Sequence, residues 1–437
     1  MRIAVVGAGI SGLASAWLLS REHAVTLFEA NDYLGGHTHT HDIELNGERH
    51  AIDTGFIVYN QSHYPLLTRL LAELGVESQL TSMSFSVHNQ ASGLEYNAGT
   101  LDGLFCQRRN LASPRFWGML RDLLRFYREA PALLEEPAPG PTLGEYLSAH
   151  AYGAAFRDDH LVPMAAALWS APPAGILAFP AQYLVRFMAN HHMLNLRGRP
   201  SWRVVRGGSA SYIRALRARW TVTERLSCPV RALRRDTHGV EIRTAAGTER
   251  FDQVVLACHS DQSLGILADA TDRERELLGA IPYQPNEAVL HTDASMLPKN
   301  RKAWAAWNAF VPATAEDDCT VSYCMNLLQG VRSAEPIIVT LNRTRDIAPD
   351  KILRRLRYQH PVYTHDAVLA QARRNEIQGQ RHTWFAGAYW GWGFHEDGLR
   401  SAVEVCGALG VNWVPAAQLA DHGNTVATAG AAIGFAT

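Results

Sequence analysis

Short apolar runs alternate with a glycine-rich turn and a helix-like segment over the first thirty residues of the chain. Residues 3–6 are all apolar, residues 13–20 form the helix-like segment, and residues 25–28 form a second apolar run. Parallel strands that are buried on both faces have continuous apolar runs of this kind. The pattern therefore predicts a strand, helix, strand unit and an α/β fold.

The turn between the first strand and the helix contains Gly7, Gly9 and Gly12, and Glu29 ends the second apolar run. In this spacing the first glycine permits a tight turn, the second lets the backbone approach a pyrophosphate, and the third lets helix and strand pack closely. The amides of the helix N-terminus then face the phosphates. Glu29 can accept hydrogen bonds from a ribose diol, and its charge disfavours NADP. The segment predicts one dinucleotide site, and no second motif of this kind supports a nicotinamide site.

Apolar runs that end in glycine or small residues recur far along the chain, so the nucleotide-binding domain is expected to be discontinuous. These runs lie at 52–56, 251–259 and 383–388, and the glycine segment 206–209 precedes an expected helix at 211–220. A strand is expected to begin at Cys228, a hairpin around Gly247, and a further helix from 398. Two long insertions lack such signals. The expected division is 1–75, 201–261 and 376–414 for the nucleotide-binding domain, 76–200 and 262–375 for a substrate-binding domain, and 415–437 for a loose tail.

Composition limits the possible functions. The chain has 437 residues, 47% of them hydrophobic, and a formal net charge of −1, which is typical of an ordinary soluble protein of about two domains and argues against nucleic acid as a partner. Its six cysteines form no CxxC pair, which argues against a zinc site or a disulfide framework. No apolar run approaches the roughly 18 residues of a membrane span, and the chain leads from Met1 directly into a strand. We expect a cytoplasmic protein.

The alternation of His37, His39 and His41 along the chain is compatible with a metal site. On an extended strand they would share one face, as three metal ligands can. No cluster of acids or cysteines completes the set, so the prediction is that the protein holds no metal.

The order of the segments GAGISGL, LGGH, DTGF, RGGS, CPV, VVLACH and FAGAY…HEDGLRSA, with Glu29 after the first of them, resembles the FAD-dependent amine oxidase and phytoene desaturase superfamily over essentially the whole chain. The resemblance implies a Rossmann-like FAD-binding domain in three layers, with a parallel sheet and a β-meander, and an inserted α+β substrate-binding domain. It also implies FAD as the cofactor.

Carried over by position, the resemblance implies that the glycine turn holds the pyrophosphate and Glu29 the adenosine ribose. Loop 35–37 would lie beside the ribityl chain, and the backbone of Val230 would meet the adenine. The helix opening at Gly398 would stabilise the negative charge of reduced flavin near O2. The expected cofactor-binding residues are Gly7, Gly9, Ile10, Ser11, Gly12, Glu29, Ala30, Gly35, Gly36, His37, Thr54, Gly55, Phe56, Val230, Ala257, Gly387, Ala388, Gly398 and Leu399.

The chain also departs from the superfamily. Members with amine oxidase activity often have a lysine bonded through water to flavin N5, in a strand that corresponds here to residues 286–290, where there is no lysine. An N5 lysine would have to come from residues 298–302. Members often have an acidic residue after the glycine of the last strand, whereas this chain has Ala388 at that position. The cysteine of covalently flavinylated members is also absent. We therefore expect non-covalent FAD and less support for amine oxidation.

Three further segments resemble a subgroup of bacterial flavoproteins. They are residues 290–293 (LHTD), 304–308 (WAAWN) and 387–398 (GAYWGWGFHEDG). Proteins of this subgroup often accompany cyclopropane-fatty-acid-synthase-like methyltransferases, and plants have a related domain fused to one. The resemblance implies a lipid acyl chain as substrate and a lipid methyltransferase as partner.

Chemistry is expected in the aromatic loop that joins two flavin-contacting glycine segments. Tyr389 and Trp392 can shape an apolar substrate against the flavin and exclude water, or can merely cover the cofactor. His395 can act as a base or hydrogen-bond partner of the flavin, or can be a structural histidine. These three residues are the predicted catalytic candidates.

Residues 115–128 are compatible with a helix that carries several apolar side chains and four arginines. Such a helix can pack on the substrate-binding domain or lie at a membrane interface, so a peripheral position at the inner membrane face stays open. A long apolar cavity that reaches the surface here would favour acyl chains. A small box between two aromatic rings with an anionic mouth would favour amines.

Together these features predict an FAD-dependent oxidoreductase that removes hydride from an apolar small molecule or lipid, as in desaturation of a fatty acyl chain. One alternative is a flavin-dependent amine oxidase. Another is a flavin-binding protein without turnover, which would act as an accessory or redox-sensing protein.

Overall fold

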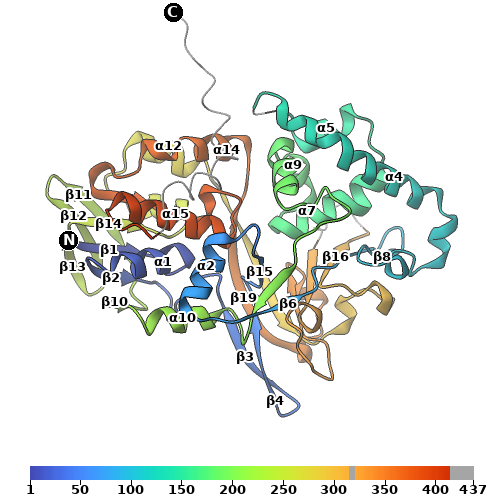
Figure 1. The fold of residues 1–437 in the computed structure, drawn as a ribbon, viewed down its shortest axis with the longest axis horizontal. Coiled ribbons are helices and arrows are strands. Elements are labelled where there is room, and N and C mark those ends of the chain that lie inside the picture. Colours follow the sequence, from blue (N-terminus) through green and yellow to red (C-terminus); the bar gives the residue numbers. More distant parts are fainter. Residues whose placement is uncertain (139, 314–319, 414–437) are drawn as a thin grey trace, which may run out of the picture.

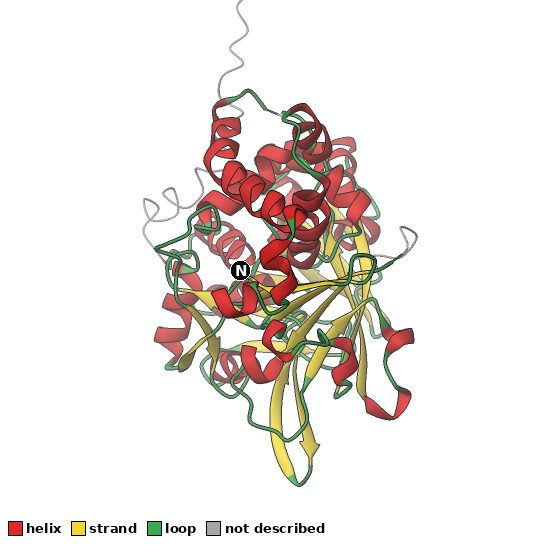
Figure 2. Cartoon of the chain, turned by 90° about the vertical axis from the view of Figure 1, so that its right-hand side faces the viewer, coloured by secondary structure: helices red, strands yellow, loops and turns green. Residues whose placement is uncertain are grey.

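Two sheets organise the two halves of the molecule in the computed structural model, which describes residues 1–138, 140–313 and 320–413 (Figure 1). A parallel sheet lies on the side of the N-terminus, and a mixed sheet lies beneath a group of helices on the other side. Figure 2 shows that most helices gather above the strands of this second half. The expected tail at 415–437 lies outside the described residues.

The parallel sheet has five strands drawn from distant parts of the chain. Its order is β10 (Val222–Arg225), β2 (Ala24–Phe28), β1 (Arg2–Val6), β14 (Gln253–Leu256) and β20 (Thr383–Phe385), and all neighbours are parallel. The strand, helix, strand unit predicted for the first thirty residues is confirmed, with α1 (Ile10–Leu19) joining β1 to β2. The α/β fold class is confirmed as well. The predicted domain boundaries stay a prediction.

The strands of the parallel sheet are buried on both faces, which produces three layers. Because side chains alternate along a strand, Ile3 and Val5 pack with α1 and α15 (His395–Ala408), whereas Ala4 and Val6 pack against an antiparallel meander. The meander consists of β11 (Ala232–Asp236), β12 (Gly239–Thr244) and β13 (Gly247–Phe251). This arrangement explains why the sequence of β1 is apolar at every position from 3 to 6.

The hairpin predicted around Gly247 is confirmed, but the strand expected to begin at Cys228 begins at Ala232. The amide of Cys228 donates to the carbonyl oxygen of Glu29 at 2.8 Å, so this segment is tied to the end of β2. Pro229 has no amide hydrogen to offer a neighbouring strand.

The second half is built on a seven-stranded sheet. Its order is β19 (Ile352–Pro361), β15 (Tyr283–His291), β18 (Ile338–Leu341), β17 (Thr320–Cys324), β16 (Trp307–Val311), β7 (Phe85–Asn89) and β8 (Leu94–Asn97). The pair of β16 and β7 is parallel and the other pairs are antiparallel. Its helices are α3 (Leu101–Leu104), α4 (Pro114–Glu129), α5 (Leu143–Ala149), α6 (Ala154–Phe156), α7 (Val162–Trp169), α8 (Pro173–Leu177) and α9 (Ala181–Asn190).

Smaller elements connect the halves. They are β3 (Thr40–Leu45) paired with β4 (Glu48–Asp53), the sheet of β5 (Val58–Asn60), β9 (Trp202–Val205) and β6 (Ser78–Thr81), and the helices α2 (Pro65–Leu74), α10 (Ala210–Arg217), α11 (Ser260–Ile266), α12 (Asp272–Gly279), α13 (Met325–Leu328) and α14 (His365–Ala372). The β3–β4 hairpin projects from the molecule (Figure 1).

The helix predicted at 115–128 is confirmed as α4. Pro114 occupies its first turn, and the Ser113 hydroxyl accepts a hydrogen bond from the amide of Phe116, so the sequence supplies both N-terminal signals. Phe116 and Phe126 on one face are buried, whereas Trp117 is half exposed. Across the described part of the chain, no helix combines the length and the apolar character that crossing a bilayer requires.

Candidate functional site

A cavity of about 1450 Å³ extends between the two halves of the molecule. The Gly7 turn lines one part of it, the end of β19 another, and helix α4 a third. Pockets that hold one drug-sized ligand measure roughly 300–1,000 Å³. The cavity therefore has room for a cofactor and a second molecule.

Each of the three glycines in the first turn is explained by a different steric feature of the structure. Gly7 has a φ of +97°, and a Cβ there would lie 2.9 Å from the carbonyl carbon of Ala257. A Cβ on Gly12 would lie 1.8 Å from the carbonyl oxygen of Gly7. A Cβ on Gly9 would meet nothing within 4 Å, because this residue borders the cavity. Its bare backbone leaves the space in which a phosphate can approach.

Glu29 is held rigidly at the end of β2. Its Oε2 accepts a hydrogen bond from the amide of Ala8 at 2.7 Å, and its Oε1 accepts from the amide and the side chain of Asn31, both at 2.9 Å. An ionised carboxylate has about four acceptor sites. Glu29 can therefore fix the glycine turn and still accept a hydrogen bond from a ribose hydroxyl.

All but three of the residues predicted to bind the cofactor line this one cavity. They are Gly7, Gly9, Ile10, Ser11, Glu29, Ala30, Gly35, Gly36, His37, Thr54, Gly55, Phe56, Val230, Ala257, Gly387 and Ala388. Gly12, Gly398 and Leu399 lie behind its wall. Leu399 is fully buried in the core, and Gly398 packs against the start of α1.

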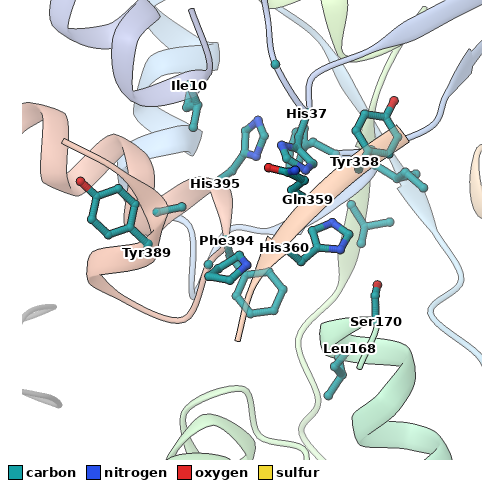
Figure 3. A pocket seen from close by; sticks show the side chains of 18 of the residues that line it. Ile10, His37, Leu168, Ser170, Tyr358, Gln359, His360, Tyr389, Phe394 and His395 are labelled. Atoms are coloured by element: carbon teal, nitrogen blue, oxygen red, sulfur yellow. The ribbon is translucent and has the colours of Figure 1, made fainter. Parts of the chain in front are cut away.

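Next to the predicted flavin loop, the side chain of His37 lies between His395 and Tyr358 (Figure 3). The ring centroid of His37 is 5.0 Å from that of Tyr358 and 5.2 Å from that of His360. Burial, followed by the neighbouring histidines, lowers the pKa of His37 well below its usual value. Burial also lowers the pKa of His360 to about 4. Both imidazoles are neutral at pH 7.

Several buried polar atoms in this part of the cavity lack a hydrogen-bond partner among the described residues. They are Nε2 of His37, Nδ1 of His259 and the hydroxyl of Tyr389. The His259 ring stacks on Tyr283 with centroids 4.3 Å apart, so its position is fixed. Buried polar groups without partners are rare in native proteins. Their presence here fits a polar cofactor that supplies the missing hydrogen bonds.

Sequence reasoning missed His259, His360 and Tyr358, which all line the cavity. His259 is two residues after Ala257, a predicted cofactor-binding residue, so its position in the sequence could have indicated that it lies in the site. Tyr358 and His360 are two residues apart on β19, so their side chains share one face of the strand. Only the pairing of β19 with β15 places that face beside loop 35–37, which contains His37.

The predicted catalytic residues have different surroundings. His395 lines the cavity, its ring stacks on Phe56 with centroids 3.7 Å apart, and its Nε2 lies 2.8 Å from the hydroxyl oxygen of Thr38. Burial lowers its pKa to about 3, so it is neutral at pH 7. Tyr389 also lines the cavity.

Trp392 differs from the expectation of a flavin-facing residue, because it does not line the cavity. Its ring packs in the helical core, 5.9 Å from that of Phe187 between centroids. Gly393, with a φ of +89°, reverses the chain after it, so that Phe394 borders the cavity instead.

The alternating histidines do not form one face of a strand. The strand begins at Thr40, so His37 and His39 precede it. The His39 ring stacks on Tyr33 with centroids 4.1 Å apart, whereas His37 faces Tyr358. Within the described ranges, no group of three or more histidine, cysteine, aspartate or glutamate side chains is placed to hold a metal ion.

The part of the cavity near α4 forms its apolar mouth. Trp117, Leu124 and Leu196 line the cavity and are 50%, 51% and 68% exposed, so the wall reaches the surface here. Among the described residues that line the cavity, Glu29 is the only acid, and none of the chain's three lysines is present. Positive charge at the mouth comes from Arg121 and Arg199.

Comparison with known proteins shows which family the sequence matches. The sequence model of the family described as flavin containing amine oxidoreductase matches residues 10–297. A tryptophan 2-monooxygenase from Allorhizobium ampelinum is 57% identical over 42 residues, which are 9% of this chain and 6% of that protein. The match thus spans a small fraction of that relative's length.

Two solved structures resemble the whole fold. Cyclohexylamine oxidase from Brevibacterium oxydans IH-35A has a TM-score of 0.68 and 16% identity, covering 93% of this chain and 98% of that one. A CLA-producing fatty acid isomerase from P. acnes has a TM-score of 0.63 and 17% identity, covering 94% and 99%. At these identities the likeness concerns the fold alone.

Proposed function

The chain belongs to the flavin-containing amine oxidoreductase family, and on this premise we propose that it binds FAD non-covalently and removes hydride from a fatty acyl chain. The FAD would occupy the part of the cavity that extends from the Gly7 turn to His395. The bare backbone at Gly9, the fixed carboxylate of Glu29 and the unpartnered polar atoms near His37 support this position.

The observation that carries the acyl-chain proposal is the apolar mouth of the cavity. Leu120, Leu123 and Leu168 continue the apolar wall inward from the exposed Trp117 and Leu124. A cavity of this kind can bury a long hydrocarbon, and burial of each methylene contributes about 0.8 kcal/mol. An acyl chain therefore gains more from this wall than a small polar substrate does.

Amine oxidation is the second candidate, and the family relationship favours it. A protonated amine would pass Arg121 and Arg199 at the mouth and would meet no acid there among the described residues. The three lysines are also elsewhere: Lys302 pairs with Asp102, and Lys351 pairs with Glu335. Charge and the missing lysine both favour the acyl chain over an amine.

Desaturation would break two C–H bonds on neighbouring carbons and form a carbon–carbon double bond. Bound FAD would supply the two-electron acceptor for the hydride, oxygen or another acceptor would take the electrons afterwards, and the second hydrogen would leave as a proton. We propose His395 and Tyr389 as the residues that orient the reacting groups. His395 is neutral and fixed by Thr38 and Phe56, so it can accept a hydrogen bond over a wide pH range.

Access from a lipid surface is part of the proposal. Trp117 and Leu124 are exposed on α4, beside Arg121 and Arg128, whose side chains are 76% and 75% exposed. Apolar and basic side chains on one helix are typical of contact with an anionic membrane. The methyltransferase partner implied by the resemblance stays a prediction.

Anaerobic titration of the purified holoprotein tests the function. We expect a bacterial lipid extract to bleach the visible absorbance of the oxidised flavin, and a panel of amines to leave it unchanged. Release of hydrogen peroxide on addition of an amine in air would support the amine oxidase instead. A stable flavin spectrum with both lipids and amines would favour a flavin-binding protein without turnover.

A further inference from the structure

The described residues that line the apolar mouth include positive charge but no acid. Arg121 on α4 and Arg199 after α9 both line the mouth, whereas the only acid among the described lining residues, Glu29, belongs to the glycine-turn part of the cavity. An acyl chain alone needs no charged group for binding. Binding of the hydrocarbon therefore does not explain why two arginines line the mouth.

Arg199 reaches back towards the cavity. Its Nε donates to the carbonyl oxygen of Asn195 at 2.9 Å. Tyr127 lines the same cavity as Arg199. Burial raises the pKa of Tyr127, and the nearby charge of Arg199 acts in the opposite direction. Arg199 also contributes, after burial, to the low pKa of the buried His160. Arg199 is exposed and takes part in none of the ion pairs between described residues.

Arg121 is only weakly neutralised. Its Nε lies 3.4 Å from Oδ1 of Asp122, and the same carboxylate also lies 3.8 Å from Arg125 and accepts a hydrogen bond from the amide of Gly153. The Arg121 side chain is 76% exposed and lines the rim of the mouth. Arg199 and Arg121 thus supply guanidinium groups from two separate elements.

We infer that Arg199, assisted by Tyr127 and Arg121, binds an anionic oxygen group at the end of the acyl substrate. This inference rests on the proposed function, because it assigns the head group of the same substrate. The anion is a carboxylate, as in a free fatty acid, or a phosphate, as in a lysophospholipid. The planar fork of Arg199 can donate two hydrogen bonds to either group, and the Tyr127 hydroxyl can donate a third.

The geometry gives the substrate an orientation. With its anion held at the mouth, the hydrocarbon extends past Leu120 and Leu123 towards the predicted flavin site. The distance from the head group then selects the carbon atoms that face the cofactor. Arg199 is a specificity-determining residue in this view, and it takes no part in the redox chemistry.

Binding of matched ligands to the holoprotein tests the inference. The probes are myristate, 1-myristoyl lysophosphatidate and 1-tetradecanol, each titrated below its micellar concentration with calorimetry as the readout. We expect at least one anion to bind about tenfold more tightly than the alcohol at low salt, because a hydrogen bond to a charged group contributes about 1.5–3 kcal/mol. Tighter binding of myristate identifies a fatty acid, and tighter binding of the phosphate identifies a lysophospholipid.

Arg199→Gln should abolish this preference and leave alcohol binding and the flavin spectrum unchanged. Arg199→Lys should retain part of it, because charge remains but the fork is lost. Arg197→Gln is the matched control: it removes the same charge from the same segment at a residue that does not line the cavity, so the preference should persist. Equal binding of anions and alcohol by the wild type would overturn the anion site alone. Failure of all three probes to bind would overturn the acyl-chain proposal with it.

Discussion

Ser11 and Gly398 are 387 positions apart, and the Ser11 hydroxyl donates a hydrogen bond to the carbonyl oxygen of Gly398 at 2.9 Å. The bond joins the first turn of α1 to the first turn of α15. Both helices begin at the cavity, where their amide groups and positive dipole ends favour anionic groups. Close packing of the two helix starts is therefore a condition for the predicted FAD site.

Gly398→Ala is expected to force the two helices apart. A Cβ at this position would lie 2.8 Å from Cγ2 of Ile10 and 2.9 Å from the Ser11 hydroxyl oxygen. Overpacking of this kind costs about 1–3 kcal/mol. Denaturant unfolding should report that loss, and flavin retention on gel filtration should fall. Gly118→Ala is the control, because a Cβ on this α4 residue meets nothing within 4 Å and should stabilise the helix by up to about 1 kcal/mol. An unchanged unfolding midpoint for Gly398→Ala would refute the steric argument.

Glu29→Gln is expected to weaken FAD binding by roughly tenfold or more, since hydrogen bonds to a charged group contribute about 1.5–3 kcal/mol. The amide would also turn a donor towards either the Ala8 amide or Asn31, both of which now donate to Glu29. Fluorescence of released flavin on dilution measures the affinity. Glu22→Gln removes the same charge from an exposed position nearby and should leave the affinity unchanged. Equal FAD affinity in Glu29→Gln and wild type would contradict the assignment.

Buried histidines should make the protein sensitive to acid. Burial lowers the pKa values of His160, His191, His291 and His360 to about 4, against about 6.5 in the unfolded chain. Between these values the unfolded chain binds more protons than the native one. The free energy of unfolding therefore decreases as pH falls from about 6.5 towards 4, by up to about 1.4 kcal/mol per pH unit for each histidine.

Two buried acids act in the opposite direction. Burial raises the pKa of Glu396 to about 7 and that of Asp53 to about 6, so the stability they contribute is lost as pH rises through those values. Four histidines outweigh two acids, and a net loss on acidification is expected in denaturant titrations. His160→Gln should flatten the slope, whereas the same change at the exposed His238 should preserve it. Identical slopes in these two variants would exclude the buried imidazole as the cause.

Contact with a lipid surface can be measured separately from catalysis. The double variant Trp117→Ser, Leu124→Gln should bind phosphatidylglycerol vesicles about tenfold less tightly in sedimentation assays, because it removes two exposed apolar side chains from α4. Leu369→Gln, which changes a leucine that is 49% exposed on α14, is the control and should bind as the wild type does. Raising the salt concentration should weaken binding of the wild type. Equal vesicle binding by both variants would remove α4 from the membrane contact.

Most residues that local sequence predicts to bind the cofactor line one cavity. Gly7 has a positive φ, and a Cβ on Gly12 would clash with the carbonyl oxygen of Gly7 inside the same turn, so the turn itself restricts the residue type at both positions. The apolar strands of the parallel sheet were equally readable, because burial on both faces leaves little choice of side chain. The strand predicted to begin at Cys228 begins at Ala232, and the amide of Cys228 donates instead to the carbonyl oxygen of the distant Glu29.

Other parts of the site carried no readable local pattern. Tyr358 and His360 reach the cavity only because β19 pairs with β15 across a sheet whose register depends on both strands. Trp392, which was predicted to face the flavin, packs in the helical core and does not line the cavity. The mouth combines α4 with the segment after α9, two elements that are separate in sequence.

By itself, the sequence determined the α/β fold, and it predicted a nucleotide-binding turn with Glu29 beside it, because each depends on backbone conformation and burial within a short segment. The tertiary structure alone decided which distant side chains share the cavity, how large it is, and that Arg199 lies at its apolar mouth with no acid among the described residues that line the mouth. Long-range packing controls those features, since the walls of a cavity come from elements whose spacing along the chain does not specify their distance in space.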